Sequence, residues 1–567
     1  MRSARLHSLP FHPPATPLQR RLWLTTQYAR DTPVYNLAYA WRIDGPFDPA
    51  AFHAALTAMT ARHEALRTTF TLREGELLRV VHTELPPGFT LLDDVAVSDV
   101  RELARQEATT RFDLGRGPLL RCRVLRHGPS RHSVLLTTHH VSVDGRAMGV
   151  VREEIAACYE AFVQKRPDAL PPVHRQFSDF AAWQQEGLDT GRFDTQIAYW
   201  KERLADITGP APLPFLKPRP MVRRPDALWE EIFCDVPLTA GARALAVDAR
   251  TSVSTVLIAA VARWLAGETG LGEALIGMST AGRSLPEFDR LVGLSTNTVP
   301  LRIPVSAATT AQLIDETRSV MLAAMDNQDV PFPLLMQELG LPRTLPVNPL
   351  THVLVALRDG LGQPLRLAGA ETTTLPAAAL SSSTDITLEL GPQPDGTIRG
   401  GLLYSPDLID PAEAARLAAG LVGVLERMAS EPRPPREVSP VGAPEPSGPP
   451  EAGPGAADGT APGPGPVADS GPSSAPAPVA ETVPPPTGDP SVRQHTSGLW
   501  QRLLDGAAPT DDDDFFAAGG DSLLAAELMV LLGEALDCSL PLDLPIGRPT
   551  FGAIVAAVTE YRVGGRQ

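Results

Sequence analysis

A proline-rich segment near the carboxyl end divides the chain into parts that must fold separately. Of the 58 prolines in 567 residues, 19 lie in the 60 residues from 431 to 490, together with nine glycines. This stretch has no apolar periodicity and cannot bury a core, which is typical of a disordered, semi-extended tether. A flexible coil of about 60 residues spans roughly 45 Å. We therefore expect a large folded part before it and a small one after it.

The length and the net charge of the chain further narrow the range of possible folds and functions. A chain of 567 residues is too long for one hydrophobic core, so two or more domains are expected. A second proline-dense stretch, residues 212–225, indicates a crossing between two lobes. The formal net charge is −16 and no basic stripe stands out, which argues against a nucleic-acid surface.

Neither a metal framework nor a membrane segment is indicated. The amino terminus lacks the apolar core of a signal sequence, and no run approaches the roughly 18 apolar residues of a membrane span. The four cysteines are far apart and form no CxxC pair, which fits reduced thiols: Cys122, Cys158, Cys234 and Cys538. We expect a cytoplasmic protein that binds no metal and no membrane.

Two adjacent histidines occupy a loop between a predicted strand and a predicted helix. His139 and His140 follow the apolar run 133–136 and precede a helical pattern that starts near Met148. Histidine titrates near neutral pH, so a histidine in such a loop can move one proton at pH 7. A lone histidine at a strand end is more often a structural residue with satisfied hydrogen bonds, so the pair needs support from the rest of the chain.

Two further residues complete a pattern with these histidines. Asp144 lies four residues after His140 and can hold the loop by pairing with a cation elsewhere. Gly145 permits a backbone conformation that a Cβ atom would hinder. Together the four residues form the string HHxxxDG.

The string HHxxxDG resembles the signature of the condensation domains of nonribosomal peptide synthetases. Further strings resemble the same family in the same order: residues 16–24, 62–70, 112–120, 177–183, 291–300, 329–332 and 348–350. The resemblance covers about residues 10–430. It implies an α/β two-lobed, chloramphenicol-acetyltransferase-like pseudo-dimer, with an N-terminal lobe over residues 1–180 and a C-terminal lobe over residues 181–432.

The resemblance also assigns residues in the second lobe. In the family, an arginine from this half pairs with the aspartate of the histidine loop, and that role is carried to Arg283, with Arg302 as the competing residue. Asn297 is matched to the strand that bridges the lobes, at the channel between them. Its amide carries donors and an acceptor, so burial there would demand partners.

The chain departs from the family pattern at several positions, which puts the substrate preference in question but not the fold. Ser295 and Thr296 stand where Phe-Val is usual. Asn327, Pro333 and Thr344 stand where His, Glu and Asp are frequent.

A second specific string follows the tether. Residues 511–524 read DDDDFFAAGGDSLL, and Ser522 begins a predicted helix. A serine at a helix start is most often only an N-cap. It can also carry a phosphodiester, because a helix N-terminus stabilises a phosphate through its free N–H groups and dipole.

The string DxFFxxGGDSL resembles that of peptidyl carrier domains, whose serine bears 4′-phosphopantetheine. The resemblance implies this cofactor on Ser522 and a small all-α four-helix carrier bundle over residues 493–567, behind a flexible linker over residues 433–492. Residues 491–567 hold 11 acidic and 5 basic side chains, a net charge of −6 without histidine, as suits a module that docks on varied partners.

The two resemblances together imply a condensation–carrier didomain of an assembly-line synthetase. It would join a donor acyl thioester to an acceptor amine held on a carrier. His140 is expected to accept or orient the proton of the amine, and His139 to be structural. Asp144 is expected to brace the loop, and the backbone N–H near Gly145 to help the oxyanion.

No adenylation domain lies between the condensation lobes and the carrier, so we expect Ser522's arm to be loaded in trans. The implied partners are a separate adenylating enzyme, a phosphopantetheinyl transferase, and loaded carrier domains of other synthetase proteins.

Several alternatives remain open. An epimerase normally follows its carrier, and a cyclisation domain would have aspartates in place of the histidines, so both are disfavoured. An ester-forming acyltransferase with a hydroxyl acceptor would use the same residues. A catalytically silent platform that recruits other enzymes to the carrier is the alternative of a different class.

Overall fold

The computed structural model describes most of the chain on either side of the tether. The described residues are 12–28, 33–166, 170–220, 226–305, 309–341, 348–357, 365–376, 380–381, 384–431, 489–504, 506–520 and 522–564. Residues 433–488 of the predicted linker lie outside the described residues. Thr344 also lies outside them. Helix α12 (Pro490–Leu504) already begins within the last three residues of the predicted linker.

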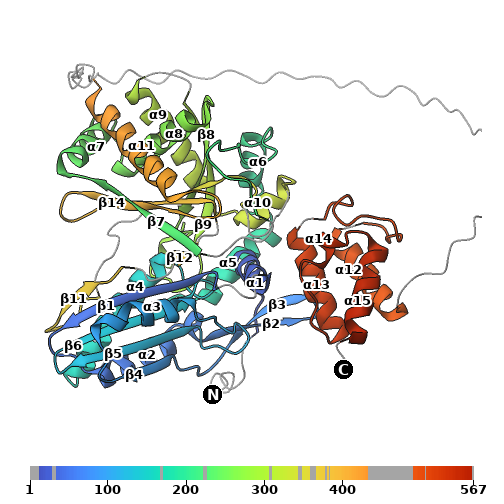
Figure 1. The fold of residues 1–567 in the computed structure, drawn as a ribbon, viewed down its shortest axis with the longest axis horizontal. Coiled ribbons are helices and arrows are strands. Elements are labelled where there is room, and N and C mark those ends of the chain that lie inside the picture. Colours follow the sequence, from blue (N-terminus) through green and yellow to red (C-terminus); the bar gives the residue numbers. More distant parts are fainter. Residues whose placement is uncertain are drawn as a thin grey trace, which may run out of the picture. The chain divides into compact units, whose positions relative to one another are not determined.

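The N-terminal lobe is built on a five-stranded sheet with the strand order β11-β1-β6-β5-β4 (Figure 1). Its strands are β1 (Asn36–Asp44), β4 (Gly88–Leu92), β5 (Leu120–Gly128), β6 (Arg131–His139) and β11 (Glu371–Thr374). Strand β11 belongs to the later half of the chain, yet it pairs antiparallel with β1. The second half of the chain therefore completes the sheet of the first lobe.

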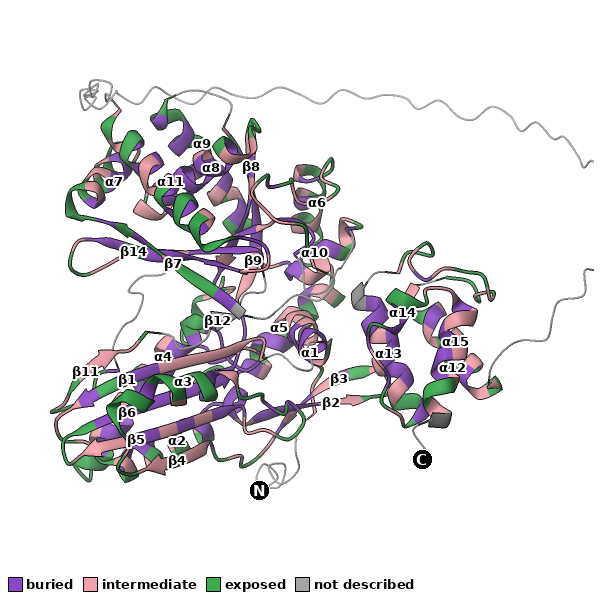
Figure 2. Ribbon diagram, in the orientation of Figure 1, coloured by how far each residue is buried: buried purple, intermediate pink, exposed green. Residues whose placement is uncertain are grey.

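Helices cover both faces of this sheet. Helix α2 (Pro49–Arg62) and helix α4 (Gly145–Val163) share one apolar core with alternate residues of the strands, among them Trp41 and Ile43 of β1. Ala40, directly before Trp41, points to the other face, where it packs against α3 (Val100–Thr109). Because side chains alternate along a strand, one strand serves both layers. Figure 2 shows the outer surface of α3 exposed.

An amino-terminal helix and a hairpin adjoin this sheet. Helix α1 (Pro17–Tyr28) has Pro17 at its first position, where no amide N–H is needed. The hairpin joins β2 (Thr68–Arg73) and β3 (Glu76–Val81).

The C-terminal lobe contains a seven-stranded mixed sheet with the order β12-β7-β14-β13-β10-β8-β9. Its strands are β7 (Asp226–Cys234), β8 (Glu273–Thr280), β9 (Asn297–Pro304), β10 (Val353–Leu357), β12 (Leu380–Ser381), β13 (Ile386–Pro392) and β14 (Ile398–Tyr404). Helices α7 (Val236–Asp248), α8 (Val253–Thr269), α9 (Thr310–Asp326) and α11 (Pro411–Ser430) cover it, as Figure 1 shows. Helix α8 has apolar residues on nearly every side, as expected of a helix that is buried at the centre of this layer.

Shorter helices of this half surround the line where the lobes meet: α5 (Phe177–Asp189), α6 (Asp194–Arg203) and α10 (Phe332–Glu338). Within the part of the chain that the structure describes, no single helix meets the length and hydropathy of a membrane span. The bent pair α7 and α8 meets them only when the two helices are taken together.

The segment after the tether is a small helical bundle, in agreement with the expected carrier fold. It comprises α12, α13 (Ser522–Leu536), α14 (Leu544–Gly547) and α15 (Phe551–Gly564). Trp500, Phe515 and Phe551 meet edge to face in its core. Leu528, in the middle of α13, is fully buried there.

Two sequence-based expectations require correction near the histidine loop. Helix α4 begins at Gly145 and not near Met148, because the Asp144 carboxylate caps it by accepting a hydrogen bond from the Ala147 N–H at 2.8 Å. Gly145 is thus the first helical residue, and its φ is not positive. Residues 291–296 of the expected bridging strand form a loop, and β9 starts only at Asn297.

Candidate active site

The two histidines occupy the end of β6, where alternation separates their environments. His139 is the last residue of the strand and is 1% exposed, whereas His140 is partly exposed. The His140 N–H donates to the Tyr35 carbonyl at 2.8 Å, which extends the β1–β6 pairing by one residue. The site therefore lies on the rim of the N-terminal sheet and not within it.

The hydrogen bonding of His140 assigns its tautomer. Its Nδ1 lies 2.8 Å from the Val143 carbonyl oxygen, which can only accept, so Nδ1 carries the proton. In the neutral ring, Nε2 then carries the lone pair. His140 is thereby oriented to accept a proton at Nε2.

His139 has the opposite arrangement and a different role. Its Nδ1 accepts from the Val141 N–H at 3.1 Å, and its Nε2 lies 3.4 Å from the Thr26 hydroxyl. Burial, helped by the neighbouring His140, lowers the pKa of His139 to about 3. His139 is therefore neutral at pH 7, and its hydrogen bonds tie it to the loop and to α1.

Asp144 is the centre of a buried hydrogen-bond network. Arg283 Nη2 lies 3.0 Å from its Oδ1 and 3.2 Å from its Oδ2, and both side chains are 2% exposed. Oδ2 also accepts from the Ser295 N–H, the Ser295 hydroxyl and the Thr296 N–H, at 3.0 to 3.2 Å. Because Arg283 follows β8, this pair joins the two lobes behind the histidine loop.

Of the two arginines weighed for this role, the structure brings only Arg283 to Asp144. Arg302 instead pairs with Asp206 at 2.5 Å and with Glu273 at 2.9 Å.

The loop that supplies the remaining donors to Asp144 depends on two glycines. A Cβ on Gly282, which has a φ of +61°, would lie 1.8 Å from the Ser295 carbonyl oxygen. A Cβ on Gly293 would lie 2.1 Å from the ring of Phe177, and the Gly293 carbonyl accepts from the Asp144 N–H. Only glycine allows these close approaches, so the loop is held against Asp144.

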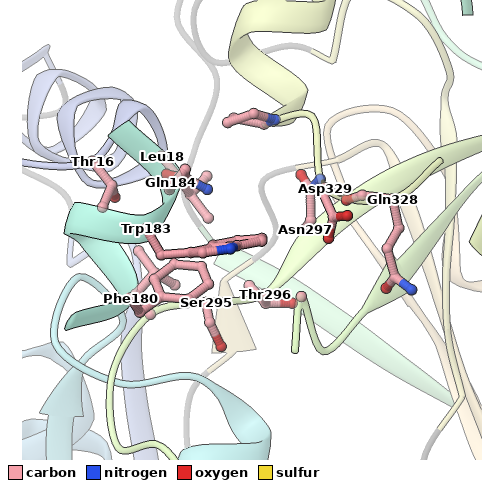
Figure 3. A pocket seen from close by; sticks show the side chains of 13 residues that line it. Thr16, Leu18, Phe180, Trp183, Gln184, Ser295, Thr296, Asn297, Gln328 and Asp329 are labelled. Atoms are coloured by element: carbon pink, nitrogen blue, oxygen red, sulfur yellow. Dashed lines mark hydrogen bonds between the residues drawn. The ribbon is translucent and has the colours of Figure 1, made fainter. Parts of the chain in front are cut away.

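A pocket adjoins this network (Figure 3). Its walls come from the start of α1, from α5, from the loop after β8 and from the loop before α10: Thr16, Leu18, Phe180, Trp183, Gln184, Gly282, Leu294, Ser295, Thr296, Asn297, Gln328, Asp329 and Pro331. His140 is not one of them. The hydroxyls of Ser295 and Thr296, which replace the usual Phe-Val, give this wall a polar character.

Asn297 lies in the pocket wall and clamps the loop before α10. Its Nδ2 donates to the carbonyls of Gln328 and Val330 at 2.8 and 2.7 Å, and its Oδ1 accepts from the Phe332 N–H at 3.0 Å. The partners that its burial was expected to demand are therefore all backbone groups. They fix the shape of the pocket.

Sequence reasoning missed several residues that contact the histidines, Val143 and Tyr35 among them. Val143 contributes only its carbonyl, and a backbone acceptor leaves no signal in the side-chain pattern. Tyr35 lies more than a hundred positions before His140, and its ring is edge-on to both histidine rings. Its place is set by the pairing of β1 with β6, which the sequence does not reveal.

The carrier bundle fits a phosphodiester at Ser522. Ser522 is the first residue of the 15-residue helix α13, whose first-turn N–H groups have no partners within the helix. A Cβ on the preceding Gly520 would lie 2.4 Å from the Phe515 ring, so only glycine lets this loop close onto the bundle.

Comparison with known proteins places each of the two folded parts of the chain in a family. The family model of the condensation domain matches residues 12–439, and that of the phosphopantetheine attachment site matches residues 497–558. The cofactor of this segment is therefore 4′-phosphopantetheine, carried on Ser522.

Curated relatives align over the condensation part. Chondramide synthase cmdD of Chondromyces crocatus is 32% identical over 426 residues, which cover 74% of this chain and 11% of the relative. Phosphinothricin tripeptide synthetase PhsC of Streptomyces viridochromogenes is 32% identical over 431 residues, which cover 73% of this chain and 39% of the relative. The chain thus spans only a small part of these proteins.

Solved structures share the same fold. The X-domain from teicoplanin biosynthesis superposes with a TM-score of 0.68 and 28% identity, over 75% of this chain and 96% of that one. The condensation domain of the Monacolin K polyketide synthase MokA superposes with a TM-score of 0.66 and 19% identity, over 74% of this chain and 98% of that one. The chain belongs to the condensation-domain family and carries a phosphopantetheine-bearing carrier domain, as in nonribosomal peptide synthetases.

Proposed function

We propose that the chain forms an amide between a donor acyl thioester and an acceptor amine held on its carrier domain. The amine nitrogen attacks the thioester carbonyl, the C–N bond forms and the C–S bond breaks. His140 accepts the amine proton at Nε2 and returns it to the departing thiolate. The observation that carries this proposal is the hydrogen bond from His140 Nδ1 to the Val143 carbonyl, which places the lone pair of the neutral ring on Nε2.

The surroundings of His140 support this assignment. The Asp144–Arg283 pair is buried at the base of the loop, so the backbone that carries His140 is held from both lobes. The Gly145 N–H belongs to the first turn of α4, where N–H groups have no partner within the helix. We assign it to the oxyanion that develops on the donor carbonyl.

The carrier supplies the acceptor. When bound at Ser522, the phosphopantetheine arm provides the thiol on which the acceptor is held as a thioester. The first-turn N–H groups of α13 would hold the phosphate end of the arm. The partners that follow are a phosphopantetheinyl transferase, loaded carriers of other synthetase proteins and a separate adenylating enzyme.

The first test is the substitution His140→Ala in a thioester-transfer assay. The pantetheinylated protein, with an aminoacyl group on Ser522, is mixed with a donor acyl thioester on a separate carrier, and the product on Ser522 is weighed by intact-protein mass spectrometry. We expect the rate to fall by about 10²- to 10⁴-fold, the typical contribution of a positioned base. His53→Ala, at an exposed position of α2, is the matched control and should leave the rate unchanged.

A second candidate is a platform that brings another enzyme to the carrier. It is favoured by the structural likeness to the X-domain, which has also been solved in a complex with OxyB. Unchanged product formation by His140→Ala would favour this platform. Parallel reactions with hydroxy-acyl and aminoacyl acceptors on Ser522 separate ester from amide synthesis, because the two products differ in mass and in their stability to mild base.

Loading in trans gives the second prediction. Only the predicted linker of residues 433–492 separates the condensation and carrier parts, and it has too few residues for an adenylating domain. Incubation of the pantetheinylated protein with amino acids and ATP alone should therefore leave its mass unchanged. A mass increase that requires ATP would contradict the proposal, and prior chemical aminoacylation of the arm is the positive control.

A further inference from the structure

Tyr35 has a backbone conformation that its side chain disfavours. Its φ is +66°, in the left-handed region, where a bulky residue is an outlier. Of the described residues other than glycine, five more have a positive φ, and none of them is aromatic: Glu74, Asp94, Lys165, Arg250 and Asp537. Such a conformation persists only where the surrounding structure imposes it, and it is enriched at functional sites.

Contacts on either side of Tyr35 impose this conformation. Its carbonyl accepts the His140 N–H at 2.8 Å. The next residue, Asn36, pairs with His139 in the β1–β6 register, and its Nδ2 donates to the carbonyls of Ala108 and Thr110 at 2.8 and 2.9 Å. The backbone of Tyr35 therefore cannot relax without breaking the pairing that holds the histidine loop.

The ring of Tyr35 is in turn directed at the two histidines. Its centroid lies 6.3 Å from that of His139 and 6.5 Å from that of His140, with both pairs edge-on. The ring is partly buried and packs against an apolar cluster that includes Phe112 and Val141. It thus joins the structural histidine, the reactive histidine and the core beneath them.

We infer that Tyr35 is a positioning residue for His140. Its carbonyl holds the main chain of His140, and its ring restricts the imidazole that Val143 anchors through Nδ1. The ring also reduces the access of water to the imidazole. The inference rests on the proposed role of His140 as proton acceptor, and it concerns orientation, not contact with substrate.

The test uses the full-length pantetheinylated protein and two substitutions at Tyr35. Tyr35→Phe keeps the ring, whereas Tyr35→Asn keeps a residue that tolerates the left-handed conformation but removes the ring. We expect Tyr35→Phe to keep kcat within twofold of the wild type. Tyr35→Asn should lower kcat at least tenfold with KM within twofold, and should move the acid limb of the kcat–pH profile upward, because a more hydrated histidine is more easily protonated.

A second readout separates this inference from the proposed reaction. In protein labelled with [13Cε1]histidine, the His140 signal is assigned by its loss in His140→Ala, and its pH titration is followed. Tyr35→Asn should shift this titration to higher pH, and Tyr35→Phe should not, whether or not amide synthesis occurs. Tyr35→Gly, which also suits the left-handed backbone, replaces Tyr35→Asn if that variant fails to fold.

Three results would overturn the inference. A wild-type kcat in Tyr35→Asn shows that the ring is not required. A large loss in Tyr35→Phe shows that the hydroxyl, and not the ring, carries the effect. An unchanged His140 titration in Tyr35→Asn shows that the ring does not act on this imidazole. By contrast, unchanged product in His140→Ala refutes the proposed reaction but leaves the titration result valid.

Discussion

The adjacent residues His139 and His140 differ in chemistry because their side chains lie on opposite sides of the chain at the end of β6. His139 ends β6 with its side chain inside, where burial lowers its pKa to about 3 and keeps it neutral. His140 follows, partly exposed, with its tautomer set by one backbone carbonyl. The chemistry of each histidine therefore follows from alternation along the strand and from its immediate hydrogen-bond partners.

A second buried histidine contact lies far from this loop, in the C-terminal lobe. Asp385 precedes β13 and is bonded to His352 at 2.5 Å and to both terminal nitrogens of Arg219. Burial alone would raise the pKa of Asp385, but the hydrogen bonds from His352 and Arg219 outweigh it and hold the pKa at about 2. Arg219 belongs to the proline-dense crossing of residues 212–225, so this cluster fixes the crossing to the sheet.

Because the pKa of Asp385 is lower in the folded chain than in the unfolded one, its contribution to stability is full above about pH 4 and is lost as the pH falls toward 2. Asp385→Asn should lower the free energy of unfolding by about 2 kcal/mol at pH 6, and by much less near pH 2.5. Urea denaturation at both pH values measures this difference. Asp315→Asn, which is exposed on α9, is the control and should show little change.

At the scale of elements, helix starts and glycine loops position the functional groups. Asp144 both caps α4 and binds Arg283, so one carboxylate defines the helix start and the contact between lobes. In the carrier, the loop before α13 closes onto Phe515, and the Gly520 N–H donates to the Phe515 carbonyl at 2.8 Å. These loops tolerate almost no added volume.

Gly520→Ala tests the closed loop of the carrier. The added Cβ would lie 2.4 Å from the buried Phe515 ring, so the loop must move and the start of α13 with it. We expect a loss of about 1–3 kcal/mol in carrier stability and slower pantetheinylation of Ser522, followed by thermal denaturation and intact mass. Gly498→Ala is the matched control, since nothing lies near its Cβ in the exposed part of α12, and it should stabilise the helix slightly. Equal pantetheinylation rates in both variants would contradict the role given to this loop.

At the scale of the molecule, the two lobes are joined by chain crossings and by a buried ion pair. Strand β11 adds residues of the later half to the sheet of the first lobe. Arg283 and Asp144 meet between the lobes with almost no exposure. Burying an ion pair costs desolvation, so the pair specifies how the lobes meet more than it adds net stability.

Arg283→Gln should leave the Asp144 carboxylate buried without its cation. Removal of one partner of such a pair typically costs about 3–5 kcal/mol, and the histidine loop should lose its support. Urea denaturation should show this loss, and the transfer rate should fall. Arg302→Gln is the matched control: its partners Asp206 and Glu273 are far more exposed than Asp144, so their charges stay solvated and the cost should be clearly smaller. Combining Arg283→Gln with Asp144→Asn should destabilise the fold by less than the sum of the two single changes.

Much of this protein was determined by local sequence patterns. The string around Ser522 marks the carrier and the start of α13, and the apolar run of residues 133–136 marks β6. These features are readable because capping, side-chain periodicity and glycine conformation depend on residues close in the sequence. The order of the family strings, from residue 16 to residue 350, likewise gave the two-lobed fold.

Tertiary structure alone decided which distant groups meet. In the folded chain Arg283, and not Arg302, pairs with Asp144. Tyr35 lies against the histidines, and the amide of Asn297 binds the backbone of the loop before α10. The tertiary structure also showed that Gly145 is an ordinary first helical residue, although the sequence suggested a special conformation. The physical reason is that a hydrogen bond to a backbone carbonyl, or a pairing across a sheet, is set by strand register and packing, and these leave no local mark in the order of residues.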